Sequence, residues 1–372
     1  MEQNNEIKRT CLYDKHVALG ALMSPFAGFD MPIQYSGIAD EHQAVRTVCG
    51  VFDVSHMGEV TVKGKDAERF VQHIFTNDVK GGKDGQVFYG MMCREDGGTV
   101  DDLLVYKMGD NDFFLVINAA NIDKDWAWIQ EQAKVFDIDL KNMSDVYGQI
   151  AVQGPEAEKV VEEVLELPCK ELTFYTCKTI LSPLTPQPLP LIISRTGYTG
   201  EDGFEIYASH ANINIYWDKL ITSGRCKPCG LGCRDTLRFE VGLPLYGDEL
   251  SDDISPVMAG LSMFVKFDKE EFIGKEALLR QKTEGTAKKV IGIELKDKAI
   301  PRHGYTVLNM DGHPIGEVTT GYHGLSVDKS VCMALIDTAY AKLGTDVQIQ
   351  IRKKVFPGTV VKKQFYSKSY KR

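Results

Sequence analysis

The chain has 372 residues, of which 43% are hydrophobic and 26% are charged, and its formal net charge is -9. One hydrophobic core rarely extends over such a length, so we expect two or three domains. The acidic balance argues against nucleic-acid binding, because a negative surface repels phosphate, although a local group of arginines can still hold a small anion.

The first residues, MEQNNEIKRTCLYDKH, are polar and resemble neither a signal peptide nor a transit peptide. No apolar run in the sequence is long enough to span a bilayer. The nine cysteines have irregular spacing, which is typical of reduced thiols in a reducing compartment. We therefore expect a cytoplasmic protein that does not associate with membranes.

Apolar and polar residues alternate in several short segments, the pattern of half-buried strands. This pattern predicts strands at 58–64, 113–118, 149–154, 189–194 and 203–209. Helical periodicity predicts helices at 66–75, 122–136, 155–167 and 216–222, and another near 270–282. Because strands and helices mix without strict alternation, we expect an α+β fold with largely antiparallel sheets.

The C-terminal part of the chain consists of short predicted strands joined by Gly, Asp and Pro turns, as in VIGIELKD and YTVLNMDGHPIGEVTTGY. This pattern is typical of a small all-β barrel or sandwich. We predict an N-terminal α+β region at 1–147, a middle α+β region at 148–279 and a C-terminal β-barrel at 280–372. The N-terminal segment could also pack into the middle region.

The segment YGMMCREDGGTVDDLLVYK (89–107) predicts a hairpin, since its Gly-Gly pair supplies the positive φ of a tight turn. The second strand opens with Asp101 and Asp102, whose side chains point to opposite faces. We expect one aspartate to face solvent or a turn and the other the interior. An inward carboxylate near Tyr89 and Tyr106 could orient a bound amine or accept its proton. The alternative is that both aspartates are ordinary polar residues of a hairpin and take no part in chemistry.

The segment SRTGYTGEDGFE (194–205) is a Gly-rich connection between two predicted strands. It lacks the Gly-Lys-Ser/Thr of a P-loop, and its glycine spacing differs from a dinucleotide-binding fingerprint. A plain hairpin loop and a binding loop both remain open. The segment holds more polar residues than a simple turn requires, namely Arg195, Tyr198, Glu201 and Glu205.

The segment CKPCGLGCRD (226–235) offers three soft ligands, Cys226, Cys229 and Cys233, whereas a structural zinc site normally has four. No second C-x-x-C or neighbouring histidine completes the set in the sequence, so we predict no metal. His56, just before a predicted strand, is expected to be a structural histidine with satisfied hydrogen bonds.

Arg234 and Arg238 lie four residues apart, on one face of a predicted helix. Two arginines in this arrangement could bind a carboxylate with paired hydrogen bonds. The alternative is an internal ion-pair network with Asp235 and Glu240.

Taken in order, these segments resemble the glycine-cleavage T-protein family. The resemblance is carried by FAGFDMPIQYSGIADEHQAVRTVCGVFDVSHMGEVTVKG, GGTVDDLLVYK, VINAANIDKDWAWI, SRTGYTGEDGFE, the GLGCRD..R.E.GLPLYG pattern and FPGTVVKKQFY, and it extends over nearly the whole chain. It implies three domains in a cloverleaf around a central folate channel, with a C-terminal β-barrel and a first domain that is discontinuous in sequence and binds folate.

The resemblance also implies an aminomethyltransferase of the glycine cleavage system. Such an enzyme transfers the methylene carbon of S-aminomethyl-dihydrolipoyl-H-protein to the co-substrate tetrahydrofolate. The products are 5,10-methylenetetrahydrofolate, ammonia and dihydrolipoyl-H-protein. The expected partners are lipoylated H-protein and folate, with no nucleic acid, membrane or metal.

Carried over residue by residue, the resemblance makes Asp102 the catalytic candidate, next to the folate nitrogens. Glu205 matches the residue that pairs with the pterin, Arg234 an active-site arginine and Arg372 a C-terminal arginine near the folate tail. The complete folate- and substrate-binding set is Met57, Tyr89, Asn118, Tyr198, Glu205, Arg234 and Arg372.

Two alternatives keep the fold and change the function. A folate-dependent demethylating or sarcosine-type enzyme usually carries a fused flavin domain, and this chain has no G-x-G-x-x-G to bind one. A non-catalytic folate-binding assembly or repair factor tends to be shorter and to keep only part of the motif set, so the aminomethyltransferase is the preferred hypothesis.

Overall fold

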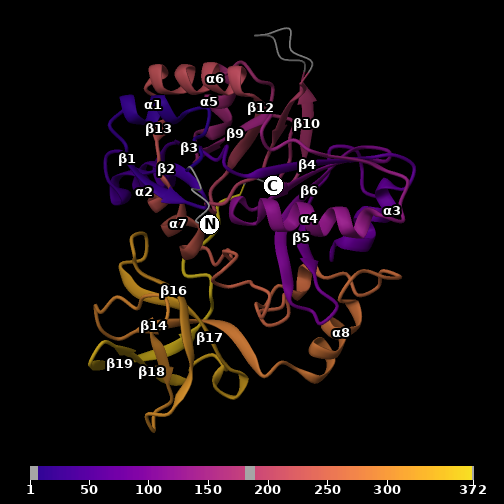
Figure 1. The fold of residues 1–372 in the computed structure, drawn as a ribbon. Helices are drawn as coiled ribbons and strands as arrows, with labels where there is room; N and C mark the ends of the chain where they lie inside the picture. The colour runs from indigo at the N-terminus through magenta and orange to yellow at the C-terminus, as the bar shows by residue number, and fades with distance from the viewer. Residues whose placement is uncertain (1–6, 181–188, 371–372) are drawn as a thin grey trace, which may run out of the picture.

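The computed structural model describes residues 7–180 and 189–370, which form two larger sheets, a small hairpin and a closed barrel (Figure 1). Neighbouring strands are antiparallel except for one pair among the paired strands described, β3 (Gly50–Asp53) with β13 (Lys227–Pro228). The predicted α+β class with largely antiparallel sheets and a C-terminal barrel is therefore confirmed. Among these residues no helix is both long and apolar enough to cross a membrane.

The first sheet is five-stranded and has the order β5-β6-β7-β4-β8. Its strands are β4 (Gly58–Lys63), β5 (Val87–Cys93), β6 (Thr99–Gly109), β7 (Asp112–Ile117) and β8 (Asp139–Asn142). Helices α3 (Ala67–Ile74) and α4 (Ile122–Ala133) follow the predicted positions and bury apolar side chains against it. The chain passes from β7 into α4 through a short 3-10 helix, η1 (Ala119–Asn121).

The second sheet is six-stranded and has the order β10-β11-β12-β9-β3-β13. Its strands are β3 (Gly50–Asp53), β9 (Tyr147–Gln153), β10 (Cys177–Ile180), β11 (Leu191–Ser194), β12 (Gly203–Ser209) and β13 (Lys227–Pro228). Helices α5 (Ala157–Val164) and α6 (His210–Ser223) pack on it. Helix α6 begins earlier than predicted because the Ser209 side chain accepts the backbone N–H of Asn212 and caps it.

The N-terminal segment joins the second sheet through β3, which pairs with β9. The same segment supplies α1 (Tyr13–Ala18), β1 (Leu22–Phe26), β2 (Phe29–Gln34) and α2 (Ile38–Thr47), and α2 packs against α7 (Leu231–Glu240). Strands from both sides of residue 147 therefore share one sheet. The exact domain boundaries stay a prediction.

The C-terminal barrel has the strand order β14-β17-β16-β15-β18-β19 and closes by pairing β19 with β14. It follows α8 (Lys275–Glu284) and consists of β14 (Lys288–Leu295), β15 (Thr306–Leu308), β16 (Pro314–Gly324), β17 (Lys329–Asp337), β18 (Asp346–Ile351) and β19 (Lys354–Val361). In Figure 1 the barrel lies below the two sheets. Beyond it the chain returns to the second sheet, where Ser369 N–H donates to Gly200 O at 2.8 Å.

A buried ion-pair network joins α7 to the barrel. Arg238 has no exposed surface, and its guanidinium donates to Asp235 Oδ1 at 2.6 Å and to Glu249 Oε2 at 2.8 Å. The other Glu249 oxygen accepts the hydroxyls of Thr319 and Thr320 on β16, at 2.6 and 2.7 Å. Such a network stabilises the interface only while every charge keeps its partner.

A second network joins α2 to the same interface. Arg46 donates to Glu201 Oε1 at 3.0 Å and to Glu240 Oε2 at 3.2 Å, and His42 Nε2 lies 3.3 Å from Glu240. Ser326 N–H donates to the other Glu240 oxygen at 2.7 Å. Burial opposes ionisation, but the contacts from His42 and Ser326 prevail and lower the pKa of Glu240 to about 2.

Replacing Glu249 by alanine should destabilise the protein by about 3–5 kcal/mol, because it leaves the Arg238 charge buried with one partner fewer. Chemical denaturation of the Glu249→Ala variant measures the loss. The control is Glu317→Ala, an exposed glutamate on β16, which should change stability by less than about 0.5 kcal/mol. Equal effects of the two substitutions would contradict the role given to the network.

Candidate functional site

Asp102 lies on β6 at the centre of a polar cluster. Its Oδ2 accepts the Tyr89 hydroxyl at 2.8 Å, and its Oδ1 accepts the Asn118 side-chain amide at 2.9 Å. Tyr89 comes from the adjacent β5, and Asn118 follows β7. The hairpin and the next strand therefore bring three predicted site residues into direct contact.

Asp101 takes the interior position that was predicted for one of the two aspartates, and Asp102 is only partly buried. Asp101 points to the opposite face of β6 from Asp102, where η1 and α4 cover it completely. Its carboxylate accepts the backbone and side-chain N–H groups of Asn118 at 2.9 and 2.8 Å and the Asn121 amide at 2.7 Å.

Burial raises the pKa of Asp102 to about 7, and the negative charge of Asp101 acts in the same direction. Hydrogen bonds from Tyr89 and Asn118 oppose the increase. A carboxyl group with this pKa changes its protonation near neutral pH, which suits it to acid–base work.

Glu205 lies on β12 in a second polar cluster. Its carboxylate accepts the Gln149 side-chain amide at 3.0 Å and the Thr196 hydroxyl at 2.5 Å, and burial raises its pKa. Gln149 also donates to the Tyr207 hydroxyl at 3.1 Å, while its Oε1 accepts no hydrogen bond from any residue in the described ranges. This cluster thus retains an unused buried acceptor, which a ligand donor could satisfy.

Arg234 and Arg238 have different environments although they lie on the same helix. The Arg234 guanidinium lies 4.5 Å from the ring centroid of Tyr198, and no ion pair or hydrogen bond to it is found within the described part of the chain. Burial lowers its pKa, while Tyr198 and Glu205 favour the charged form. The ion-pair alternative therefore holds in part for Arg238: Asp235 is its partner as expected, but Glu249 takes the place of Glu240, which pairs with Arg46 instead. Arg234 stays available to an anion.

Met57 and His56 lie beside these clusters. Met57 packs between the cluster that contains Tyr106 and Tyr207 and the one that contains Leu237. The expectation of a satisfied His56 is wrong, because its Nδ1 has no hydrogen-bond partner among the described residues. Burial and the charge of Arg234 lower its pKa to about 4, so His56 is neutral.

Electrostatic interactions link the clusters into one site. Tyr198 interacts with the charges of both Asp102 and Arg234, and Glu205 interacts with Arg234. Tyr175 interacts with Asp102 and Glu205. The fold thus gathers the predicted residues of the first sheet, the Gly-rich loop and α7; these are Met57, Tyr89, Asp102, Asn118, Tyr198, Glu205 and Arg234. Arg372 lies outside the described residues.

The Gly-rich loop folds closely around Gln153 of β9, which explains its glycines. A Cβ on Gly197 would lie 2.0 Å from Gln153 Oε1, and one on Gly203 would lie 2.4 Å from Gln153 Nε2. Arg195 forms an ion pair with Asp202 and thus stabilises the conformation of the loop. The loop is therefore a tightly packed connection, and it also directs Tyr198 toward Arg234.

The cysteine segment has an additional neighbour that the sequence did not indicate. Ligand atoms of Glu41, Cys229 and Cys233 lie within 4.8 Å of one another, and all three residues are buried. Glu41, however, already accepts four backbone N–H groups, including that of Gly230 at 2.8 Å. The absence of a metal stays a prediction.

Several residues of the site were missed because single polar positions carry no motif. Gln149 and Thr196 donate to Glu205, while Asn121 donates to Asp101 and Tyr207 accepts from Gln149. Gln149 and Tyr207 lie in strands predicted correctly from their alternation. A polar residue inside an otherwise apolar buried strand was the available signal.

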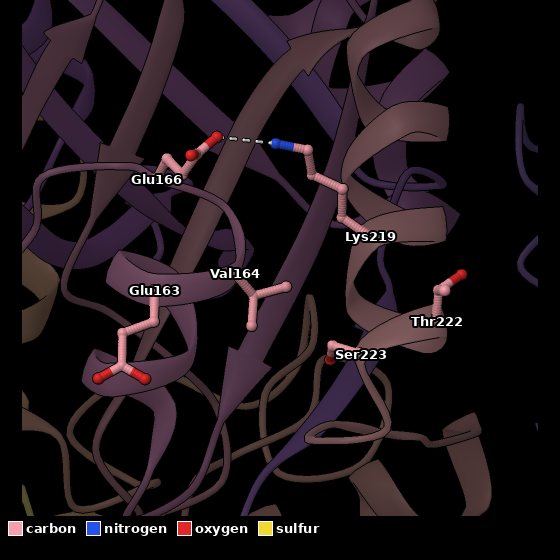
Figure 2. Close-up of a pocket in the computed structure, with 6 residues that line it drawn as sticks. All are labelled: Glu163, Val164, Glu166, Lys219, Thr222 and Ser223. Carbon is pink, nitrogen blue, oxygen red and sulfur yellow. Dashed lines mark hydrogen bonds and ion pairs between the residues drawn. The ribbon is translucent and has the colours of Figure 1, made fainter.

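An open pocket lies between α5 and α6, away from these clusters (Figure 2). It is lined by Glu163, Val164, Glu166, Lys219, Thr222 and Ser223. Glu166 and Lys219 form an ion pair across it at 3.1 Å. None of the predicted site residues lines this pocket.

Comparisons with known proteins agree over nearly the whole chain. Residues 12–269 match the GCVT N-terminal domain, and residues 288–367 match the glycine cleavage T-protein C-terminal barrel domain. An aminomethyltransferase of Alkaliphilus oremlandii is 50% identical over 99% of this chain and 100% of its own length, and one of Thermoanaerobacter pseudethanolicus is 47% identical with the same coverage.

A crystal structure of the glycine cleavage system aminomethyltransferase T from Bartonella henselae superimposes with a TM-score of 0.93. That chain is 32% identical, and the match covers 99% of this chain and 100% of that chain. The similarity thus includes both larger sheets and the barrel, in sequence and in fold. The protein belongs to the glycine cleavage T-protein family.

Proposed function

We propose that the protein is a tetrahydrofolate-dependent aminomethyltransferase of the glycine cleavage system. It transfers the methylene carbon of S-aminomethyl-dihydrolipoyl-H-protein to tetrahydrofolate and releases ammonia and dihydrolipoyl-H-protein. The observation that carries the proposal is the convergence of Asp102, Glu205 and Arg234, in a chain similar over its full length to aminomethyltransferases.

Asp102 is the catalytic candidate. Attack of a folate nitrogen on the methylene carbon creates positive charge, which a nearby carboxylate stabilises most strongly where water is excluded. Tyr89 and Asn118 hold Asp102 in position through two hydrogen bonds. With a pKa of about 7, the same carboxyl group can also receive a proton from the folate nitrogens.

Glu205 is the candidate for holding the pterin ring. A carboxylate offers about four acceptor positions, and Gln149 and Thr196 occupy two of them. The remaining lone pairs suit the adjacent amino and ring N–H groups of a pterin. The unpaired Oε1 of Gln149 provides a further acceptor beside them.

Arg234 supplies a positive charge for an anionic part of the substrates, and Tyr198 holds its guanidinium plane. Met57 supplies apolar contact at the same site. Arg372 is proposed to meet the glutamate tail of the folate.

Lipoylated H-protein and folate are the proposed partners, and neither a metal nor a nucleic acid takes part. The proposed location is the cytoplasm. The cysteines of the described residues are unpaired, as expected in a reducing compartment.

Ammonia release from aminomethylated H-protein, measured with and without tetrahydrofolate, tests the function. Equal amounts of folate-dependent ammonia and methylenetetrahydrofolate are expected. Tight folate binding without turnover would instead identify a non-catalytic folate-binding relative.

Asp102→Asn should lower kcat by about 100-fold or more while much of the folate affinity is retained, because the amide keeps the shape and loses the charge. Steady-state kinetics at saturating folate measure the change. Asp112→Asn, at the exposed end of β7, is the matched control and should leave kcat unaltered. Unchanged turnover in Asp102→Asn would refute the catalytic role.

Glu205→Ala should weaken tetrahydrofolate binding by about 10- to 100-fold, since hydrogen bonds to a charged group contribute about 1.5–3 kcal/mol. Titration calorimetry measures the affinity. Glu166→Gln, in the pocket of Figure 2, is the control and should bind folate normally. If Glu166→Gln weakened binding and Glu205→Ala did not, the folate would lie in the other pocket.

A further inference from the structure

Two buried thiols lie side by side at the edge of the second sheet. Cys49 Sγ and Cys226 Sγ are 3.3 Å apart, and the two residues are 1% and 4% exposed. Both belong to one hydrophobic cluster, so both side chains point to the same face of the sheet. The contact joins parts of the chain that are 177 residues apart, and the proposed reaction uses neither thiol.

The backbone around these thiols has the geometry that a disulfide needs. Cys49 comes directly before β3 and Cys226 directly before β13, and these parallel strands pair Gly50 with Lys227. The Lys227 N–H donates to Cys49 O at 3.0 Å, which fixes this register. Paired strands lie about 4.8 Å apart, and disulfides join residues whose Cα atoms are about 4.4–6.8 Å apart. Rotation of the side chains can therefore join the sulfurs with little movement of the backbone.

The edge strand β13 gives an oxidant its route to the pair. The strand has only two residues and lies at the end of the strand order. A short edge strand opens more readily than the centre of a sheet. Burial raises the pKa of the Cys226 thiol, so little reactive thiolate forms while the edge is closed. Oxidation should therefore be slow, and Cys226 should react first because it is more exposed than Cys49.

We propose that Cys49 and Cys226 are a redox-sensitive pair, which a hydroperoxide converts into a disulfide that cross-links β13 to β3. The hydroperoxide transfers one oxygen to Cys226 Sγ, which gives a sulfenic acid and releases an alcohol, or water if the oxidant is hydrogen peroxide. Cys49 Sγ then attacks this sulfur and expels water. The two thiols thus lose two electrons and two protons, and these reduce the hydroperoxide. A dithiol restores both thiols by thiol–disulfide exchange.

The cross-link holds the beginning of α7 on the second sheet. From Cys226 the chain passes through β13 to α7, which carries Arg234 and Arg238. In the reduced protein this connection is held by backbone hydrogen bonds, such as that from Cys229 N–H to Val51 O at 2.9 Å. A covalent link between residues so far apart in sequence restricts the unfolded chain strongly and stabilises the folded state. This inference goes beyond the proposed function and does not depend on it.

Peptide mass mapping tests the pairing. The full-length protein is treated with hydrogen peroxide, denatured, alkylated at its remaining thiols and digested. We expect a cross-linked pair of peptides that contains Cys49 and Cys226 and that disappears after reduction with dithiothreitol. The matched control is Cys332→Ala, which removes another buried thiol, on β17, and should form the same link. Cys49→Ala should not form it.

Three results of the mapping would overturn the proposal. The first is a link between Cys229 and Cys233 instead, whose sulfurs also lie within 4.8 Å of each other. The second is oxidation of Cys226 to a sulfinic acid while Cys49 stays free. The third is that both thiols stay free in protein whose Cys11, a partly exposed thiol, has been oxidised.

Thermal unfolding, followed by circular dichroism, tests the effect on stability. The cross-linked protein should unfold about 5 °C or more above the reduced protein. Cys226→Ala should have the same Tm with and without hydrogen peroxide, whereas Cys332→Ala should keep the increase. Equal Tm values for cross-linked and reduced protein would contradict the stabilising role. The mapping of the unsubstituted protein does not require any variant to fold, and neither measurement requires turnover, so a failure of the proposed function would leave both results valid.

Discussion

The site depends on the buried charge of Arg238, because this residue fixes α7 against the barrel. A guanidinium without exposed surface is tolerated only among carboxylates, and Asp235 and Glu249 supply them. With Arg238 held in this way, Arg234 one turn earlier is directed to the Gly-rich loop, where it lies over Tyr198. The same helix thus carries one arginine for the architecture and one for a ligand.

Burial is also the common cause of the unusual protonation states in the site. It raises the pKa of Asp102 and Glu205 and lowers that of His56. The pKa values of the two carboxyl groups therefore lie closer to neutral pH, while the imidazole of His56 stays uncharged. Because the site is buried, the charge of Arg234 and the hydrogen bonds around it are screened less than they would be at the surface.

Much of the fold could be predicted from the sequence, because alternation and helical periodicity reflect burial directly. The strand that carries Glu205 and the hairpin that carries Asp102 were both expected, and both formed. The predictions that failed concern partners. Glu240 was considered as an ion-pair partner for the arginines of its own helix, and His56 was expected to be satisfied. Instead Arg46 pairs with Glu240 and Phe26 packs on His56, and both come from elsewhere in the chain.

The sequence by itself determined the class of fold, the barrel and the motifs that place the chain in its family, since these depend on local pattern and on residue order. Only the tertiary structure decided which charged side chains pair. Arg46 and Glu240 lie far apart in the sequence, and no spacing rule connects them, yet α2 and α7 bring the guanidinium to 3.2 Å from the carboxylate. Electrostatic coupling acts through space in a low-dielectric interior, so it becomes visible only when distant segments are packed together.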